Sequence, residues 1–322
     1  MYLQNPDFPR LIAGSVKWVF LAVFALLSLC EWWAPKRPMK LSKPRRWTGH
    51  MALFVGSTLL FRWIYSMGSV ATAAALAAAA QRSPYSLLNR IPMSFGWRVV
   101  CGFIALDLVH YCFHRANHSV YWMWRLHLLH HSDRDFDITN NLRIHPAEIA
   151  LNRLVILAAI VILAPPALAV ALYALADSVL GLFVHANVRI PPVLERPMRL
   201  LIVTPQLHQI HHSLDQNEQQ RNIGVVLSWW DRVFGTYQGE LAGKGDLYFG
   251  VAEVSAEECL RPLHLATGMY ASPATRSEAD GEFHPTNRPD KQSRGTVVHA
   301  GRRVAVGAAR PPRGSRDVGV GV

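Results

Sequence analysis

The sequence predicts an all-α integral-membrane protein, a bundle of about four to five spanning helices with a cytosolic, histidine-rich helical cap. Hydrophobic residues make up 51% of the 322 residues and charged residues 17%, against about 25% charged residues in a typical soluble domain. This composition excludes intrinsic disorder for the body of the chain. Of the 15 histidines, eleven fall between His110 and His212. The four cysteines are scattered and form neither a disulfide framework nor a CxxC metal site.

The N-terminal third predicts membrane helices around a basic loop. Leu11–Trp33 is apolar apart from Lys17 and Glu31 and is long enough to cross a hydrocarbon core of about 30 Å. It is too long for a signal-peptide core, so we expect a retained anchor. Six lysines and arginines follow within residues 36–46, which predicts a cytoplasmic loop and an external N-terminus. Met51–Ala80 is a second apolar run, to be filled by one tilted helix or a broken one.

Two further apolar regions follow. Met93–His118 predicts a third helix, whose membrane portion is Val99–Leu106 and whose far end leaves the hydrocarbon. In Ile149–Val184 the pair Pro165–Pro166 removes two backbone donors, so the run is expected to break there into a helical hairpin. One kinked span over Leu154–Ala176 is the alternative.

These features divide the chain into three expected parts. Residues 1–98 hold the N-terminal membrane helices and the basic loop, and residues 99–240 form a histidine-rich domain with a membrane hairpin at 149–184. Residues 241–322 are polar and are expected to be disordered from about residue 271, where Gly, Pro, Arg and Ser predominate. The net charge of +11 comes from basic residues that flank apolar runs, which indicates membrane orientation and no nucleic-acid partner.

Three short segments carry histidines at helical spacing. Residues three and four apart share a helix face, so each segment predicts imidazoles that point at one ion. A single histidine is more often a core residue than a ligand, but two separate HxxHH segments together favour metal binding. Eight imidazoles are too many for one metal, and imidazole suits iron, zinc, copper or nickel. The sequence therefore predicts two nearby metals, held by His114 and His118, by His127, His130 and His131, and by His208, His211 and His212.

Topology gives an independent test of this grouping. Two HxxHH segments that share one metal centre must be separated by an even number of membrane crossings, and a hairpin at 149–184 satisfies this. Two predicted crossings also separate the basic loop from the first histidine segment. The metal centre is therefore expected to face the cytoplasm.

These segments resemble the fatty acid hydroxylase/sterol desaturase superfamily of integral-membrane di-iron oxygenases. The resemblance covers Asp107–Tyr237, about 40% of the chain, and its motifs follow the family in order and spacing. The matching motifs are Tyr111-x-x-His114-Arg115-x-x-His118, Trp124-Arg-x-His127-x-x-His130-His131-Ser132, Arg143-x-His145-Pro146-x-Glu148, His185-Ala-Asn187, Thr204-Pro205-x-x-His208-x-x-His211-His212-Ser213, Asn222-x-Gly224 and Trp230-Asp231-x-x-Phe234-Gly235-Thr236.

The resemblance assigns metal-ligand roles to the eight histidines named above and to His185. In fatty-acid hydroxylases a second histidine follows four residues after His185, but here that position is Arg189, so His145 is expected to replace it as a ligand. We expect four further residues to orient the ligands or line the pocket, as partners behind the imidazoles do in many metal sites. They are Asp107, His110, Asn187 and Asp231. For Asp107 the alternative is a helix terminus at the membrane interface.

The resemblance implies oxygen-dependent hydroxylation or desaturation of a sterol-like or fatty-acyl lipid. Its cofactors would be two iron ions, with dioxygen as co-substrate and no catalytic side chain beyond the metal ligands. The chain has no glycine-rich dinucleotide fingerprint and no CxxCH haem-attachment motif, so we expect no haem, and electrons from a separate ferredoxin or cytochrome b5-type protein. The alternative function is a histidine-rich membrane transporter or binding protein for divalent metals.

Overall fold

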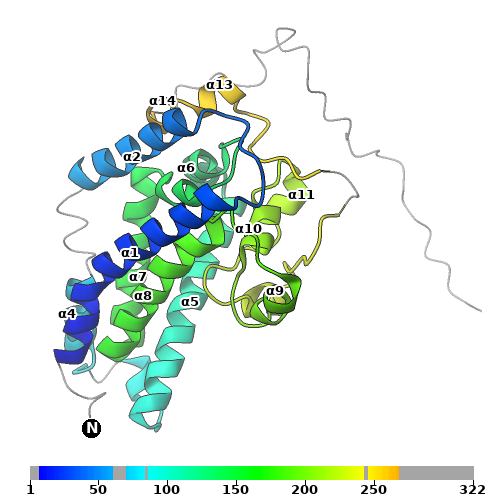
Figure 1. Cartoon of the computed structure of the whole chain (residues 1–322). Helices are drawn as coiled ribbons and strands as arrows, with labels where there is room; N and C mark the ends of the chain where they lie inside the picture. The colour runs from blue at the N-terminus through cyan, green and yellow to red at the C-terminus, as the bar shows by residue number, and fades with distance from the viewer. Residues whose placement is uncertain (1–6, 61–69, 84–85, 243–245, 268–322) are drawn as a thin grey trace, which may run out of the picture. The chain divides into compact units, whose positions relative to one another are not determined.

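The computed structural model describes residues 7–60, 70–83, 86–242 and 246–267, and within these ranges it is helical, with isolated β-bridges and no strand. Figure 1 shows α1, α5, α7 and α8 side by side, with α6, α13 and α14 at the upper end. The elements are α1 (Asp7–Trp33), α2 (Lys43–Leu60), α4 (Val70–Ala80), η2 (Leu87–Asn89), α5 (Phe95–Ser119), α6 (Tyr121–His131), η3 (Ile138–Leu142), α7 (Pro146–Leu163), α8 (Ala167–His185), α9 (Pro192–Met198), α10 (Pro205–His211), α11 (Gln216–Gln219), α12 (Trp229–Val233), α13 (Ala256–Cys259) and α14 (Pro262–Ala266).

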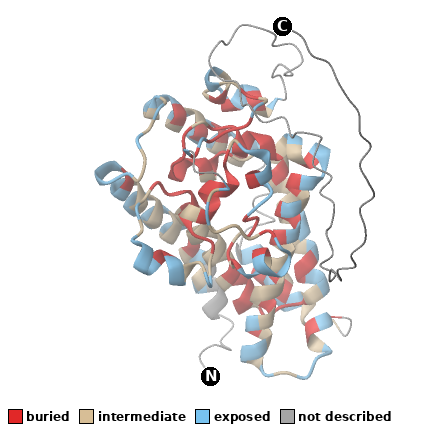
Figure 2. Cartoon of the chain, turned by 90° about the vertical axis from the view of Figure 1, so that its right-hand side faces the viewer, coloured by how far each residue is buried: buried red, intermediate tan, exposed pale blue. Residues whose placement is uncertain are grey.

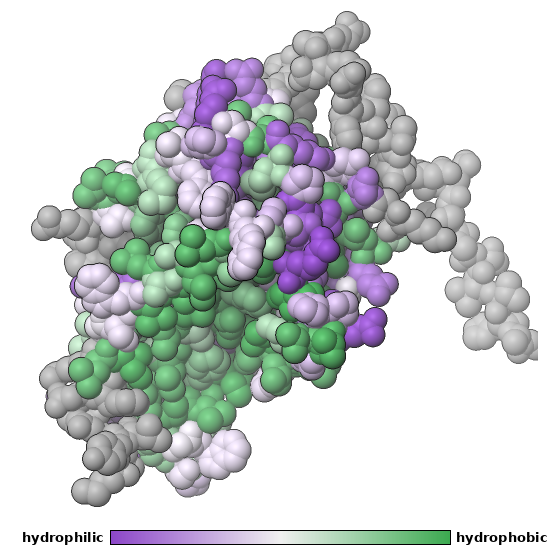
Figure 3. Space-filling view, in the orientation of Figure 1, coloured by the Kyte–Doolittle hydropathy of each residue, from purple (hydrophilic) through white to green (hydrophobic). Residues whose placement is uncertain are grey.

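Four of these helices are long and apolar enough to cross a membrane: Gly14–Trp33 of α1, α5, α7 and α8. Between 11% and 39% of their most apolar windows is buried inside the protein, so most of their side chains point outward. Figure 3 shows the resulting apolar band over the lower part of the bundle and polar residues above it. The prediction of an all-α membrane bundle is confirmed.

The second apolar run contains two helices, α2 and α4, on either side of residues 61–69, which lie outside the described residues. Neither helix is a candidate span by itself. The helix α2 instead joins the cap, where its residues Arg46, His50 and Leu53 are buried. The polar tail expected from residue 271 also lies outside the described residues.

The break expected at the proline pair separates α7 from α8. Ala164 ends α7 in a left-handed conformation (φ 47°), and Pro166 precedes the first residue of α8. The bend lies directly against α5 at Gly102. A Cβ atom at Gly102 would come within 2.7 Å of the Pro165 Cβ, closer than real Cβ contacts allow. The glycine therefore permits the close approach of this bend to α5.

Two hydrophobic clusters fix the helices that carry the histidines. In the bundle, Leu106 of α5 packs with Ile160 of α7 and Val170 of α8. In the cap, Leu128 and Leu129 of α6 pack against residues of α2 and of the segment 251–265. Figure 2 shows buried residues concentrated where cap and bundle meet. Burial is thus greatest around the histidine segments.

Candidate metal centre

Nine buried histidines form two adjacent clusters whose ring nitrogens lie within 4.8 Å of one another in each cluster. The five-histidine cluster consists of His114, His118, His127, His131 and His211; the four-histidine cluster consists of His130, His185, His208 and His212. The clusters touch, since the rings of His131 and His212 stack with centroids 4.2 Å apart. The structure thus brings together every histidine predicted as a ligand except His145.

Each HxxHH segment divides its histidines between the clusters, which differs from the expectation that all three would point at one ion. On α6, His127 and His131 face the five-histidine cluster and His130 faces the other. On α10, His211 faces the five-histidine cluster, whereas His208 and the C-cap residue His212 face the other. At about 100° per residue, positions i and i+4 lie about 40° apart, whereas adjacent residues lie about 100° apart. Helix geometry therefore directs the i,i+4 pair to one site and the remaining histidine to its neighbour.

Hydrogen bonds behind the rings set the direction of the free ring nitrogens. The Nδ1 atoms of His114, His211 and His185 lie 2.7, 2.9 and 2.7 Å from the carbonyl oxygens of Ile223, Arg221 and Gly181. A carbonyl only accepts, so each Nδ1 carries the proton, and a neutral ring then presents the lone pair of its Nε2. This is the tautomer that a metal ligand needs.

The clusters fit metal ions because their free nitrogens are too close to be left unpaired. His114 Nε2 and His127 Nε2 are 3.1 Å apart, although both Nδ1 atoms face acceptors and both Nε2 atoms carry lone pairs when the rings are neutral. Two ligands at right angles, each about 2.1 Å from an ion, are separated by about 3 Å. Buried ring nitrogens without a hydrogen-bond partner include both of His118 and Nε2 of His211. An ion in the five-histidine cluster would take one nitrogen from each of these rings.

Electrostatics keep these histidines in the ligand form. Burial, followed by repulsion from neighbouring imidazoles, lowers the pKa of His130, His131, His208 and His212 well below the ordinary range. Burial lowers the pKa of His211 to about 3. These side chains are therefore neutral near pH 7, and a neutral imidazole is the form that binds a metal.

Glu148 contacts the histidine clusters. It is part of the sequence motifs, but they do not show its role. Its Oε1 accepts from His127 Nδ1 at 2.7 Å and from Asn117 Nδ2 at 3.0 Å. A carboxylate behind a ligand imidazole fixes its orientation and strengthens it as a donor. The RxHPxE segment is the part of the sequence that could have indicated this role, because its glutamate lies in the first turn of α7, beside the histidines.

His145 lies outside both clusters. It is the N-cap of α7, where Nδ1 accepts from the backbone N–H of Ala147 and Nε2 lies 2.8 Å from the carbonyl oxygen of Ala266. Both ring nitrogens are therefore occupied by local contacts. His145 therefore does not take the place of the family histidine that is Arg189 in this chain.

Asp107 and Asp231 contact the segment that follows the third histidine segment and touch no imidazole. Asp107 accepts from the backbone N–H groups of Val226 and Leu227 and from Trp230 Nε1, at 2.9–3.2 Å. Asp231 accepts from the backbone N–H of Gly224 at 3.0 Å. Both carboxylates therefore hold the backbone close to Ile223, whose carbonyl accepts from His114.

His110 and Asn187 also lie away from the cluster nitrogens. His110 contacts Tyr173 Oη at 2.8 Å and Asn152 Nδ2 at 3.0 Å and lines a pocket between α4, α5, α7 and α8. Asn187 accepts from the backbone N–H of Arg37 at 3.0 Å and ties the basic loop to the end of α8.

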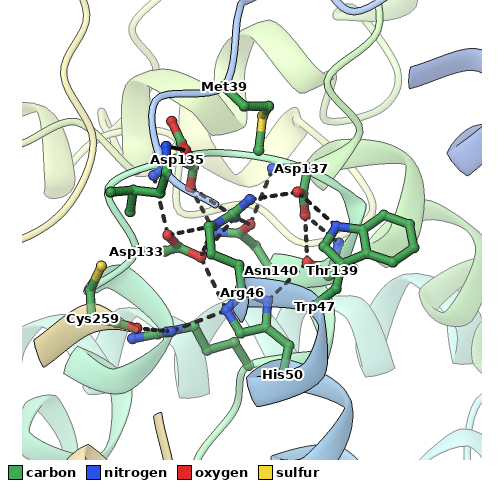
Figure 4. A network of polar contacts seen from close by, with 12 residues as sticks. Met39, Arg46, Trp47, His50, Asp133, Asp135, Asp137, Thr139, Asn140 and Cys259 are labelled. Atoms are coloured by element: carbon green, nitrogen blue, oxygen red, sulfur yellow. Dashed lines mark hydrogen bonds and ion pairs between the residues drawn. The ribbon is translucent and has the colours of Figure 1, made fainter. Parts of the chain in front are cut away.

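A buried ionic network joins the start of α2 to the loop that follows α6 (Figure 4). Arg46 donates to Asp133 at 2.8 Å and to Asp137 at 2.6 Å, and all three side chains are almost fully buried. Burial alone would raise the pKa of Asp133 and Asp137, but the Arg46 charge holds both below the ordinary range. The sequence alone shows Arg46 only as part of a positively charged loop.

Arg143 completes this network beside the second histidine segment. It donates to the Leu129 carbonyl at 2.8 Å and to Ser132 Oγ at 2.7 Å, while another of its N–H groups reaches the Cys259 carbonyl at 2.7 Å. Leu129 and Ser132 flank His130 and His131. Arg143 therefore fixes the backbone on both sides of two ring ligands that belong to different clusters.

Comparison with known proteins agrees with this site. Residues 99–236, which contain both clusters, match the family model "Fatty acid hydroxylase". The chain is 29% identical over 158 residues to alkylglycerol monooxygenase of Homo sapiens and 31% identical over 150 residues to ornithine lipid hydroxylase OlsE of Rhizobium tropici. These matches cover 48% and 45% of this chain but only 34% and 43% of the relatives. No solved structure matches. The region that holds both clusters, residues 99–236, is therefore similar to the fatty acid hydroxylase family, and the chain spans less than half the length of these two relatives.

Proposed function

We propose that this protein is a membrane-bound di-iron oxygenase that hydroxylates, or desaturates, an aliphatic position of a lipid with dioxygen. The observation that carries this proposal is the pair of touching histidine clusters at the ends of membrane-length helices. The names of the relatives support a lipid substrate, because they denote a monooxygenase for alkylglycerols and a hydroxylase for ornithine lipids.

The residues of the two clusters would hold one iron each, through five and four imidazoles. Iron supplies the oxidising power toward an unactivated C–H bond that side chains lack. The protein's own part is positioning: Glu148 and the carbonyls of Ile223, Arg221 and Gly181 hold the Nδ1 protons and aim the Nε2 atoms. Burial of the rings excludes water from the reacting atoms.

The pocket that contains His110 marks the proposed route of the hydrocarbon to the metals. Its walls, which include Leu106, Ile156 and Val170, lie between membrane-length helices and enclose only about 40 Å³, so they would have to move apart to admit an alkyl chain. His110 is one helical turn before the cluster residue His114, so an alkyl chain in this pocket approaches the metals from the membrane. Apolar walls bind such a chain by removing its surface from water.

We propose that the metal centre faces the cytoplasm. The basic loop lies at the same end as the clusters, because Lys36 Nζ donates to Gln209 of the third histidine segment at 2.9 Å and the backbone N–H of Lys40 donates to Asp135. Cytoplasmic loops are the ones enriched in lysine and arginine. This orientation gives a soluble ferredoxin or cytochrome b5-type protein access as electron donor.

The transporter alternative is less well supported. Transport sites lie near the bilayer midplane and usually include carboxylates among the ligands. Both clusters found among the described residues consist of histidines alone and lie at the C-terminal ends of α5 and α8.

The test combines metal analysis with lipid mass spectrometry. Cells that make the wild-type protein should accumulate a lipid with one additional oxygen atom or with two fewer hydrogens, and the purified protein should hold iron. His130→Ala combined with His211→Ala removes one ligand from each cluster and should abolish both signals. His264→Ala removes an exposed histidine outside the clusters and should leave both unchanged. Wild-type protein without iron, or a product that persists in the double variant, would contradict the proposal.

A further inference from the structure

A second cavity, of about 280 Å³, lies beside the five-histidine cluster and shares no lining residue with the His110 pocket. Its lining includes Arg115 and Ser119 of α5 together with Gln220, Arg221 and Phe234 of the later segments. We call it the Arg115 cavity. Its volume is near the lower end of the range of about 300–1,000 Å³ that is typical of small-molecule sites.

Only the backbone of one segment separates this cavity from the clustered histidines. Arg221 and Ile223 line the cavity, and their carbonyls accept from His211 Nδ1 and His114 Nδ1. Gln220, also in the lining, donates to the carbonyl of His118 at 3.3 Å. A molecule in the cavity is therefore close to the metal site without touching the imidazoles.

The cavity carries positive charge that no side chain neutralises. Arg115 donates to Tyr111 Oη at 3.2 Å and Arg221 donates to the carbonyl of Gly235 at 3.0 Å, both neutral acceptors. Within the described ranges neither arginine forms an ion pair, and no acidic residue lines the cavity. The C-terminus of α5 contributes about half a negative charge, which two full positive charges outweigh. Each guanidinium also retains further N–H donors.

Two features indicate that the anion belongs to a lipid. Arg115 and Ser119 lie in the last turns of α5, a membrane-length helix, and the end of such a helix lies at the depth of the lipid headgroups. The rim is also apolar: Phe234 lines the cavity with 46% of its surface exposed, and the adjacent Val233 is 67% exposed. A phosphate or carboxylate linked to hydrocarbon fits this surface. Guanidinium groups bind such oxyanions through paired hydrogen bonds, and the hydrocarbon contacts the apolar rim.

We propose that the Arg115 cavity binds the anionic headgroup of the lipid that the enzyme oxidises. The identification of this lipid as substrate rests on the proposed function, whereas the binding of an anionic headgroup does not. The charge of the cavity then determines which class of lipid is oxidised.

Binding is tested on the purified, metal-loaded protein in detergent, by native mass spectrometry with phosphatidylglycerol, phosphatidylcholine or inorganic phosphate. Arg115→Gln combined with Arg221→Gln should weaken phosphatidylglycerol binding about tenfold and leave phosphatidylcholine binding unchanged. The double lysine variant keeps the charges and should retain most of the affinity. Arg261→Gln removes an exposed cap arginine that pairs with Glu257 and should have no effect. With a hydroxylated lipid as readout, the glutamine pair should raise KM and leave kcat nearly unchanged.

Several outcomes would overturn the headgroup site. These are equal binding by the glutamine pair and the wild type, an equal loss with Arg261→Gln, and binding of inorganic phosphate that phosphatidylglycerol does not displace. Slower reduction by the electron-donor protein with unchanged lipid binding would assign the two arginines to protein docking instead. If phosphatidylglycerol binds as expected but no oxidised lipid forms in any membrane, the proposed function fails and the binding site stands.

Discussion

The carboxylate of Glu148 lies 2.7 Å from Nδ1 of His127, and both groups are buried. Among the nine clustered histidines, His127 is the one whose Nδ1 contacts a carboxylate in the part of the chain that the structure describes. The pair joins the first turn of α7 to α6 and so couples the membrane helix to the cap.

Glu148→Gln should weaken metal binding while the protein stays folded. Glutamine keeps the size of the side chain but loses the charge that strengthens the His127 imidazole as a donor. Loss of such a partner typically costs about 10- to 100-fold in metal affinity or activity. Iron retention during dialysis against a chelator measures the effect. Glu257→Gln makes the same change at an exposed glutamate outside the clusters and serves as control. Retention equal to wild type in Glu148→Gln would contradict the role.

Single ligand changes should remove the metals one at a time. His118→Ala affects only the five-histidine cluster, and His185→Ala affects only the other. We expect each variant to retain about one metal of two, because the untouched cluster keeps all four or five of its histidines and imidazole ligands act locally. Metal analysis of the purified variants gives the stoichiometry. Wild-type metal content in both variants would refute the two-site arrangement.

Arg46→Met should destabilise the protein strongly. It leaves Asp133 and Asp137 buried without their counter-charge, and breaking a buried ion pair from one side costs about 3–5 kcal/mol. Arg45→Met is the matched control, because Arg45 is the exposed neighbour on the same helix. Thermal unfolding in detergent compares the two variants. Equal melting temperatures would show that the network is dispensable.

Gly102→Ala should destabilise the bundle, whereas Gly96→Ala should not. Both residues lie in α5, but a Cβ at Gly102 meets Pro165 at 2.7 Å and a Cβ at Gly96 meets nothing within 4 Å. Overpacking costs about 1–3 kcal/mol, whereas alanine in open helical space gains up to about 1 kcal/mol over glycine. Resistance to detergent-induced unfolding ranks the two variants. The same loss in both would exclude a specific contact with the proline bend.

The metal-free protein should lose stability as the pH falls. Burial holds the pKa of His211 at about 3, below the ordinary value of 6.5, so the unfolded chain takes up protons that the folded protein refuses. The stabilising contribution is therefore complete above pH 6.5 and is lost between pH 6.5 and about 3. Unfolding of chelator-treated protein from pH 8 downward measures this slope. His211→Ala should show a shallower slope, and a pH-independent midpoint in the wild type would contradict the linkage.

Local sequence spacing predicted much of the site, because it depends on helix periodicity. The HxxHH segments and HxxxH identified eight clustered histidines, and the family pattern added His185. The proline pair predicted where the fourth apolar run divides. Glu148 escaped functional interpretation because a carboxylate at the start of a helix is common, and its role depends on where α6 packs.

The sequence by itself determined the class of protein, an all-α membrane bundle with clustered imidazoles, because hydropathy and helical spacing are local properties of the chain. Only the tertiary structure decided how those imidazoles are shared. It places His130 with His185 and His212 and leaves His145 as a helix cap. It also pairs Arg46 with aspartates about ninety residues away. Such pairings depend on the packing of distant helices and on the cost of burying an unpaired charge, which no short window of sequence records.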